Sequence, residues 1–143
     1  MQTRAKQTGS RRGRSQSGRI TLPAVLGAVA VGLLSYATVK YLPLYRDFSM
    51  VKASVSEAGQ RSITMHDRVG ARQWFDEQMR DAGFDWLRAG SLYWQPVDRE
   101  HLDIGVRYEV QVHHLVGSQT LVFAWYCTAT ADGCGEFVPN FSE

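Results

Sequence analysis

Two cysteines are the residues of this chain whose types and spacing most directly suggest chemistry. Cys127 and Cys134 stand seven positions apart, and Asp132-Gly133 between them is a turn signal. The two thiols could therefore meet across a hairpin, and an oxidising compartment would favour a disulfide. Closing so short a loop would stabilise the fold by roughly 2–3 kcal/mol in the chain-entropy model. The alternative is a buried, apolar Cys127 beside a free Cys134.

The histidines, in contrast, predict no metal site. They are His66, His101, His113 and His114. Neighbouring residues of a strand point to opposite faces, so His113 and His114 cannot chelate one ion as a simple pair. No spacing of histidine and cysteine matches a zinc site, and the chain has no phosphate loop, nucleophile elbow or HExxH motif. We therefore expect no catalytic residue, no metal and no cofactor, and we identify no small-molecule substrate.

Length and charge exclude further classes of protein. The chain has 143 residues, which is too few for a TIM barrel or a doubly wound cofactor-binding fold. Residues 1–19 carry six basic residues and no acidic one, whereas the remainder carries ten basic and fourteen acidic residues, a net charge of −4. A mildly acidic folded part argues against nucleic acid as the main partner.

An uncharged segment follows the basic tail. Residues 20–39 contain no charged residue, and twenty helical residues span about 30 Å, the thickness of a bilayer core. Because six positive charges precede the segment and only two follow it closely, the positive-inside rule places the N-terminus in the cytoplasm. We expect a disordered cytoplasmic tail over residues 1–19, a single transmembrane anchor over 20–42 and a periplasmic domain over 43–143. The lipid bilayer is thus the first expected partner.

Three other interpretations compete with a retained anchor. Ser35-Tyr36-Ala37 has the small-x-small pattern of a signal peptidase site, which would release a secreted binding domain. Ser10-Arg11-Arg12 suggests a twin-arginine export signal, although Arg14 stands where an apolar residue is usual. A buried helix of a soluble protein is the third, and the all-round apolarity and the basic flank disfavour it.

Two helical faces are candidate interfaces. In the anchor, small residues recur every four positions and would let a second helix approach closely; they are Ala24, Ala28 and Gly32. After the anchor, apolar residues follow the spacing of an amphipathic helix; they are Leu44, Phe48, Val51 and Val55. The second face must be covered either by the protein's own sheet or by a neighbour. We expect a membrane-protein partner or self-association through the anchor.

The helices after the anchor have recognisable ends. Gly59 is a natural stop for the amphipathic helix. A second helix is expected from about Asp67 to Ala82, with Thr64-Met65-His66-Asp67 as a loose capping box and Gly83 as its end.

The rest of the chain predicts strands. Residues 91–97 form a short candidate strand, and residues 102–112 alternate strictly between apolar and polar positions, which predicts one buried face. Residues 120–130 are apolar on both faces, which is typical of a central strand or of one covered by a helix. The expected fold class is α+β, with a transmembrane helix continuing into an amphipathic helix, a second short helix and an antiparallel meander of three to four strands.

Several short motifs resemble a family of small single-pass inner-membrane proteins of Gram-negative bacteria, domain-of-unknown-function family 4845. They are Gly18-Arg19-Ile20-Thr21-Leu22, Leu42-Pro43-Leu44-Tyr45 with Phe48 and Val51-Lys52, and Tyr108-Glu109-Val110-Gln111-Val112 before Gly117. The chain departs from the family in its longer basic tail, in Pro23 and in its C-terminal cysteines. The resemblance implies an inner-membrane protein with a small periplasmic domain, and it implies no activity.

The layout also resembles type IV pilins and pseudopilins, which share a basic leader, an apolar N-terminal helix and a C-terminal sheet. Their processing motif is missing, because Arg19 follows Gly18 and the early anchor has no glutamate. The leading hypothesis is a non-enzymatic subunit of an envelope or secretion complex. A pilin-like filament subunit and a secreted binding domain are the alternatives.

Overall fold

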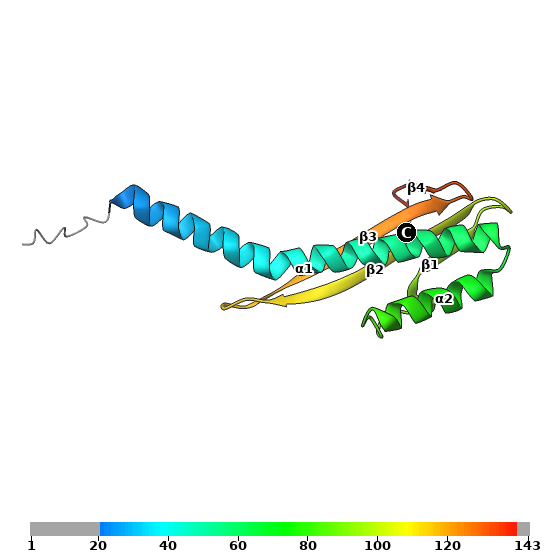
Figure 1. Ribbon diagram of the computed structural model, residues 1–143, viewed down its shortest axis with the longest axis horizontal. Helices are drawn as coiled ribbons and strands as arrows, with labels where there is room; N and C mark the ends of the chain where they lie inside the picture. The colour runs from blue at the N-terminus through cyan, green and yellow to red at the C-terminus, as the bar shows by residue number, and fades with distance from the viewer. Residues whose placement is uncertain (1–20, 140–143) are drawn as a thin grey trace, which may run out of the picture. The chain divides into compact units, whose positions relative to one another are not determined.

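The computed structural model describes residues 21–139, so the basic tail predicted over residues 1–19 lies outside the described residues. Its elements are α1 (Leu22–Thr64), α2 (Arg68–Asp81), a 3-10 helix η1 (Ala89–Ser91), β1 (Tyr93–Pro96), β2 (Leu102–His113), β3 (Ser118–Ala129) and β4 (Cys134–Glu136) (Figure 1). The strands form one antiparallel sheet in the order β1-β2-β3-β4. The predicted α+β class and the meander are confirmed.

The chain divides into two units between Tyr36 and Ala37. The described part of the first unit is the beginning of α1, whose side chains are exposed. The second unit contains the rest of α1, α2 and the sheet. Every buried apolar residue among those described belongs to the second unit, so this unit has its own core.

The core lies between α1 and the inner face of the sheet, with α2 beside them. Val51, Val55 and Ala58 of α1 are fully buried, as are Ile104 of β2 and Cys127 of β3. They form one cluster with residues of α2 and of the segment before β1. The segments that form this cluster lie far apart in the sequence, so the core depends on long-range packing.

The second half of the apolar stripe expected as an amphipathic interface packs against the protein's own sheet, and the first half does so only in part. Val51 and Val55 are inaccessible to solvent. Phe48 is half-buried, with its ring centroid 5.0 Å from that of Phe123 and 6.2 Å from that of Tyr108. Leu44 is also only half-buried. The sequence left open whether the protein's own sheet or a neighbouring protein would cover these residues, and in the structure Val51 and Val55 pack against the sheet.

The expected helix end at Gly59 is wrong, because α1 continues to Thr64. A Cβ atom at Gly59 would lie 2.7 Å from the Cβ of Ala129 and 3.1 Å from Cγ2 of Ile104. The first distance is shorter than real Cβ contacts and the second is tighter than most of them, so glycine permits a close approach of helix and sheet here. A glycine near a helix end and a glycine at a close crossing look alike in a sequence.

The second helix begins one turn later than a capping box at Thr64 would require. Asp67 is its N-cap, and the Asp67 side chain accepts a hydrogen bond from the Gly70 N–H at 2.8 Å. Thr64 instead ends α1. The expected stop after Ala82 is present, since Gly83 adopts a positive φ of 85°.

Strand β2 has the alternation that the sequence predicts, although the burial of its inner face is uneven and Val112, near its end, is again buried. Leu102, Ile104 and Val106 are at most 1% exposed, whereas Val110 is only half-buried. On the outer face, Gly105 is buried beneath Tyr126, and a Cβ there would lie 2.0 Å from that ring. Gly105 therefore lets the aromatic ring cross the strand.

Strand β3 is central, between β2 and β4, as one of the two readings of its apolar sequence predicts. Its outer face carries part of an aromatic row rather than a helix. The Tyr126 ring centroid lies 5.8 Å from that of Tyr93 on β1 and 6.3 Å from that of Phe137 after β4. Val122, further along the same face, is 52% exposed.

Candidate functional site

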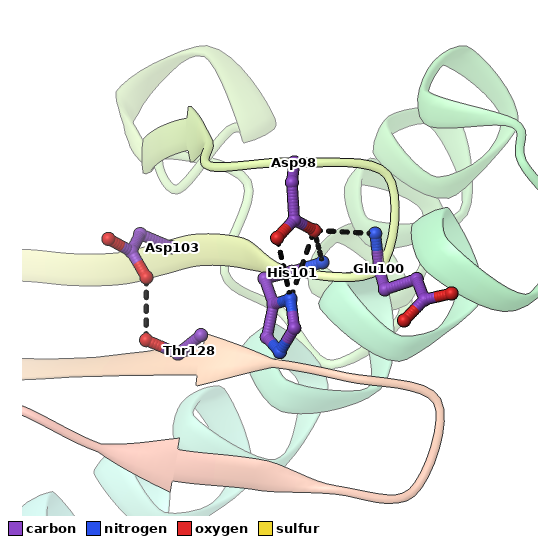
Figure 2. Close-up of polar contacts among 5 residues, drawn as sticks. All are labelled: Asp98, Glu100, His101, Asp103 and Thr128. Carbon is purple, nitrogen blue, oxygen red and sulfur yellow. Dashed lines mark hydrogen bonds and ion pairs between the residues drawn. The ribbon is translucent and has the colours of Figure 1, made fainter.

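A polar cluster lies in the turn between β1 and β2 (Figure 2). Oδ1 of Asp98 accepts hydrogen bonds from the backbone N–H groups of Glu100 and His101, both at 2.7 Å. Nδ1 of His101 lies 2.9 Å from both carboxylate oxygens of Asp98. The Glu100 N–H, followed by the His101 side chain, lowers the pKa of Asp98 because both stabilise the ionised carboxylate.

The chemistry that this cluster can do is limited by what accompanies it. A carboxylate that orients an imidazole forms two members of a hydrolytic triad, which also needs a nucleophile. Among the described residues, the only hydrogen-bond partner of the His101 ring is Asp98. The nearby Thr128 hydroxyl donates instead to Asp103 at 2.6 Å and so links β3 to β2 (Figure 2). We assign the cluster to stabilisation of the turn.

Of the other three histidines, His66 lines a pocket together with Glu100 and His101 of this turn, whereas His113 and His114 lie at the other end of β2. His66 follows the end of α1 with a positive φ of 52°. His113 ends β2, and Nε2 of His114 lies 3.3 Å from the Tyr41 hydroxyl. Within residues 21–139, no three histidine, cysteine, aspartate or glutamate side chains are grouped so that they could hold a metal ion.

The two cysteines come together as one of the sequence interpretations predicts. Cys127 and Cys134 form a disulfide with a Cα–Cα distance of 5.6 Å. Cys127 is inaccessible to solvent and Cys134 is half-buried. The bond joins β3 to β4 beside a turn in which the Thr130 N–H donates to the Gly133 carbonyl at 2.8 Å. Its role in this position is structural.

A mixed polar and aromatic cluster attaches β4 to α1. Lys52 forms an ion pair with Glu136, and the indole N–H of Trp125 donates to the same Glu136 oxygen at 2.8 Å. The Lys52 ammonium also lies 5.1 Å from the centroid of the Trp125 ring, within the range of a cation–π interaction. The hydrogen bond from Lys52, followed by that from Trp125, lowers the pKa of Glu136.

Tyr108 also has a displaced pKa. Its ring lies 5.1 Å from Trp86 and 5.5 Å from Phe123, measured between centroids. Burial, with a smaller contribution from Asp47, raises the pKa of Tyr108 to about 12 because both disfavour the phenolate. A tyrosine held neutral in an aromatic cluster is suited to packing.

The small residues of the predicted anchor interface lie on the first part of α1. Ala24, Ala28 and Gly32 are exposed, and a Cβ added at Gly32 would meet nothing within 4 Å. This part of α1 is long and apolar enough to cross a membrane, and its most apolar window contains no buried residue. By length and composition such a helix could be a membrane anchor or a signal sequence, and its use as a helix–helix interface stays a prediction.

A mainly apolar groove, which the sequence did not indicate, lies beside β3. It has a volume of about 500 Å³, and its apolar lining includes Val122, Tyr126, Phe137 and Val138. In the described sheet, β4 pairs with β3 over Cys127–Ala129, and the Phe137 N–H donates to the Tyr126 carbonyl at 3.2 Å just beyond this pairing. The earlier part of β3 therefore has an open edge beside the groove, and an open edge can bond an added strand through its backbone groups.

No protein-family model matches the chain, and neither does any curated protein or solved structure. Its relation to the two families whose motifs or layout it resembles therefore stays a prediction, and its own residues must carry a functional interpretation.

Proposed function

We propose that the chain is a non-enzymatic, single-pass inner-membrane protein whose outer domain binds a partner in an envelope or secretion complex. In this proposal, residues 20–42 span the membrane and residues 1–19 lie in the cytoplasm. Residues 43–143 lie in the periplasm of a Gram-negative bacterium.

The observation that carries the proposal is the contrast between the two parts of α1. Leu22, Val31, Leu33 and Leu34 are 63–74% exposed. Apolar area left in water costs about 25 cal/mol per Å², and the second unit completes its core without these residues. A bilayer supplies the missing apolar surroundings.

Two further observations support the orientation. The basic residues before the apolar run outnumber those that follow it closely, which favours a cytoplasmic N-terminus. The Cys127–Cys134 disulfide fits an oxidising compartment such as the periplasm.

The retained anchor and the cleaved signal are distinguished by the mature N-terminus. The compact unit begins at Ala37, so cleavage after this residue would remove only the first residue of that unit. We expect mass spectrometry of the membrane fraction to find peptides from before Ala37, and a periplasm-specific reporter fused after Glu143 to be active. A mature N-terminus at Thr38 would support the secreted-domain alternative, and activity of a cytoplasm-specific reporter would reject the orientation.

The partner in this proposal is another envelope protein, and an extended segment of it binds at the open edge of β3. Its backbone would add as a strand, and its apolar side chains would enter the groove lined by Val122 and Tyr126. The groove is open on the outer face of the sheet, whereas the inner face is filled by α1.

The groove can be tested by co-purification from crosslinked membranes. Val122→Arg places a charge in the groove at a half-exposed position. Val97→Arg makes the same change at a site that is 60% exposed and does not line the groove. We expect the partner to be lost from Val122→Arg and retained by Val97→Arg. Equal recovery with both variants would reject the groove as the binding surface.

A further inference from the structure

The turn between β2 and β3 exposes two apolar side chains. It comprises residues 114–117, closed by a hydrogen bond from the His114 N–H to the Gly117 carbonyl at 2.9 Å. Leu115 and Val116 are each 94% exposed, more than any other large apolar residue described. The core of the described residues contains no residue of this turn.

The tip is held against the beginning of the second unit. The Lys40 ammonium donates to the His113 carbonyl at 3.1 Å, and the Tyr41 hydroxyl donates to Oε1 of Gln119 at 3.2 Å. The ring of Tyr41 also lies 6.1 Å from that of His114, between centroids. These contacts hold the end of β2 and the start of β3 against Lys40 and Tyr41, which are neighbours on α1.

The direction of the hairpin follows from a second pair of contacts. Gly59 of α1 lies against Ile104 of β2, and Lys40 lies against His113. The two intervals are about 28 Å along the helix and about 30 Å along the strand. Strand β2 therefore runs along α1 from Gly59 toward Lys40, as Figure 1 shows for the two elements. Leu115 and Val116 continue this path past Lys40 by about two strand residues, or roughly 7 Å.

The position of Lys40 in the sequence indicates where the membrane surface would lie along α1. Lys40 is the first charged residue after the uncharged run of residues 20–39, and Tyr41 and Tyr45 follow it. Lysine and tyrosine in this order are typical of the membrane–water interface. Exposed apolar side chains at that level meet lipid before they meet bulk water.

We propose that the β2–β3 turn is a second membrane contact, in which Leu115 and Val116 enter the interfacial layer of the bilayer that holds the anchor. The inference rests on the proposed anchor. The hairpin then gives the second unit a lipid contact of its own.

The test uses the full chain reconstituted in phosphatidylcholine–phosphatidylglycerol vesicles, with and without bromine on the acyl chains. A tryptophan is introduced at the tip by Val116→Trp and, as a matched control, on the exposed outer face of β2 by Glu109→Trp. Position 109 lies four strand residues back from His113, which is about 13 Å. Emission is compared with that of the unmodified chain, which already contains four tryptophans.

We expect brominated lipid to quench the added emission of Val116→Trp and to leave that of Glu109→Trp unchanged, with unaltered thermal unfolding of both variants. Equal emission from Val116→Trp in the two lipids would overturn the lipid contact. Crosslinking of residue 116 to a protein in cell membranes, without quenching in vesicles, would overturn it in favour of a protein partner. Failure of the unmodified chain to float with vesicles would overturn the anchor and the tip contact together, whereas flotation without quenching would overturn the tip contact alone.

Discussion

Substitution of Gly59 by alanine tests the close approach of α1 to the sheet. In an open helix, glycine to alanine stabilises by about 0.5–1 kcal/mol, because alanine loses less backbone entropy on folding. At Gly59 the new methyl group would lie 2.7 Å from the Cβ of Ala129 and 3.1 Å from Cγ2 of Ile104. Neither neighbour is the end of a flexible side chain, so helix and sheet must separate. Overpacking of this kind costs about 1–3 kcal/mol.

The cost exceeds the gain, so we expect Gly59→Ala to lower the free energy of unfolding by about 1–2 kcal/mol. For a unit of this size, that corresponds to a fall in Tm of roughly 5–10 °C. The assay is thermal unfolding of the full chain in detergent, followed by near-ultraviolet circular dichroism. Gly90→Ala is the matched control, because a Cβ at Gly90 would meet nothing within 4 Å.

A double variant tests whether Ala129 is the residue that the new methyl group meets. Ala129→Gly removes the closest atom, so Gly59→Ala should cost less in the Ala129→Gly background than in the natural chain. An increase in Tm for Gly59→Ala alone would refute the close approach. Additive effects of the two substitutions would place the strain somewhere other than at Ala129.

Three further predictions concern the sheet. Val106→Asp should lower the free energy of unfolding by about 3 kcal/mol or more, because it buries an unpaired carboxylate at a site 1% exposed. Arg107→Asp, on the opposite and exposed face, should change the free energy of unfolding by less than about 0.5 kcal/mol in the same assay. Cys134→Ser should lower the free energy of unfolding by roughly 2–3 kcal/mol, and a reductant should then have no further effect on the Tm of that variant. The pKa of Glu136 is lowered in the folded state. Its ion pair with Lys52 therefore stabilises the fold at pH values above the ordinary pKa of 4.5, and this stabilisation is lost as the pH falls through the lowered pKa. Glu136→Gln should flatten that part of a stability–pH profile measured at low salt.

Local patterns in the sequence predict the order and type of the elements well. Strict alternation over residues 102–112 identifies β2 and its buried face, because one face of this strand is covered and the other is wet. The 4-3-4 spacing around Val51 identifies the buried face of α1 in the same way. Both patterns reflect the regular spacing of buried residues within one helix or strand, so a single segment of sequence is enough to recognise them.

What the sequence does not predict depends on contacts between distant segments. Gly59 has the appearance of a helix stop, and only the presence of Ala129 across the interface explains why a glycine stands there. The contact of Lys40 with His113 joins residues 73 positions apart, and no local pattern signals it. Gly105 is an intermediate case, because a glycine inside an alternating strand is itself a signal of close backbone approach.

The pairing of α1 with a late hairpin has a consequence for the order of biogenesis. The buried stripe of α1 is complete once residue 64 has been made, but the strand that covers it ends at residue 129. At a synthesis rate of about 5–20 residues per second, the stripe stays uncovered for roughly 3–13 seconds. During that interval an amphipathic helix beside a bilayer can lie in the lipid interface with its apolar face inward. In the proposed topology, the membrane is the nearest apolar surface for this stripe until β2 and β3 have been exported and can cover it.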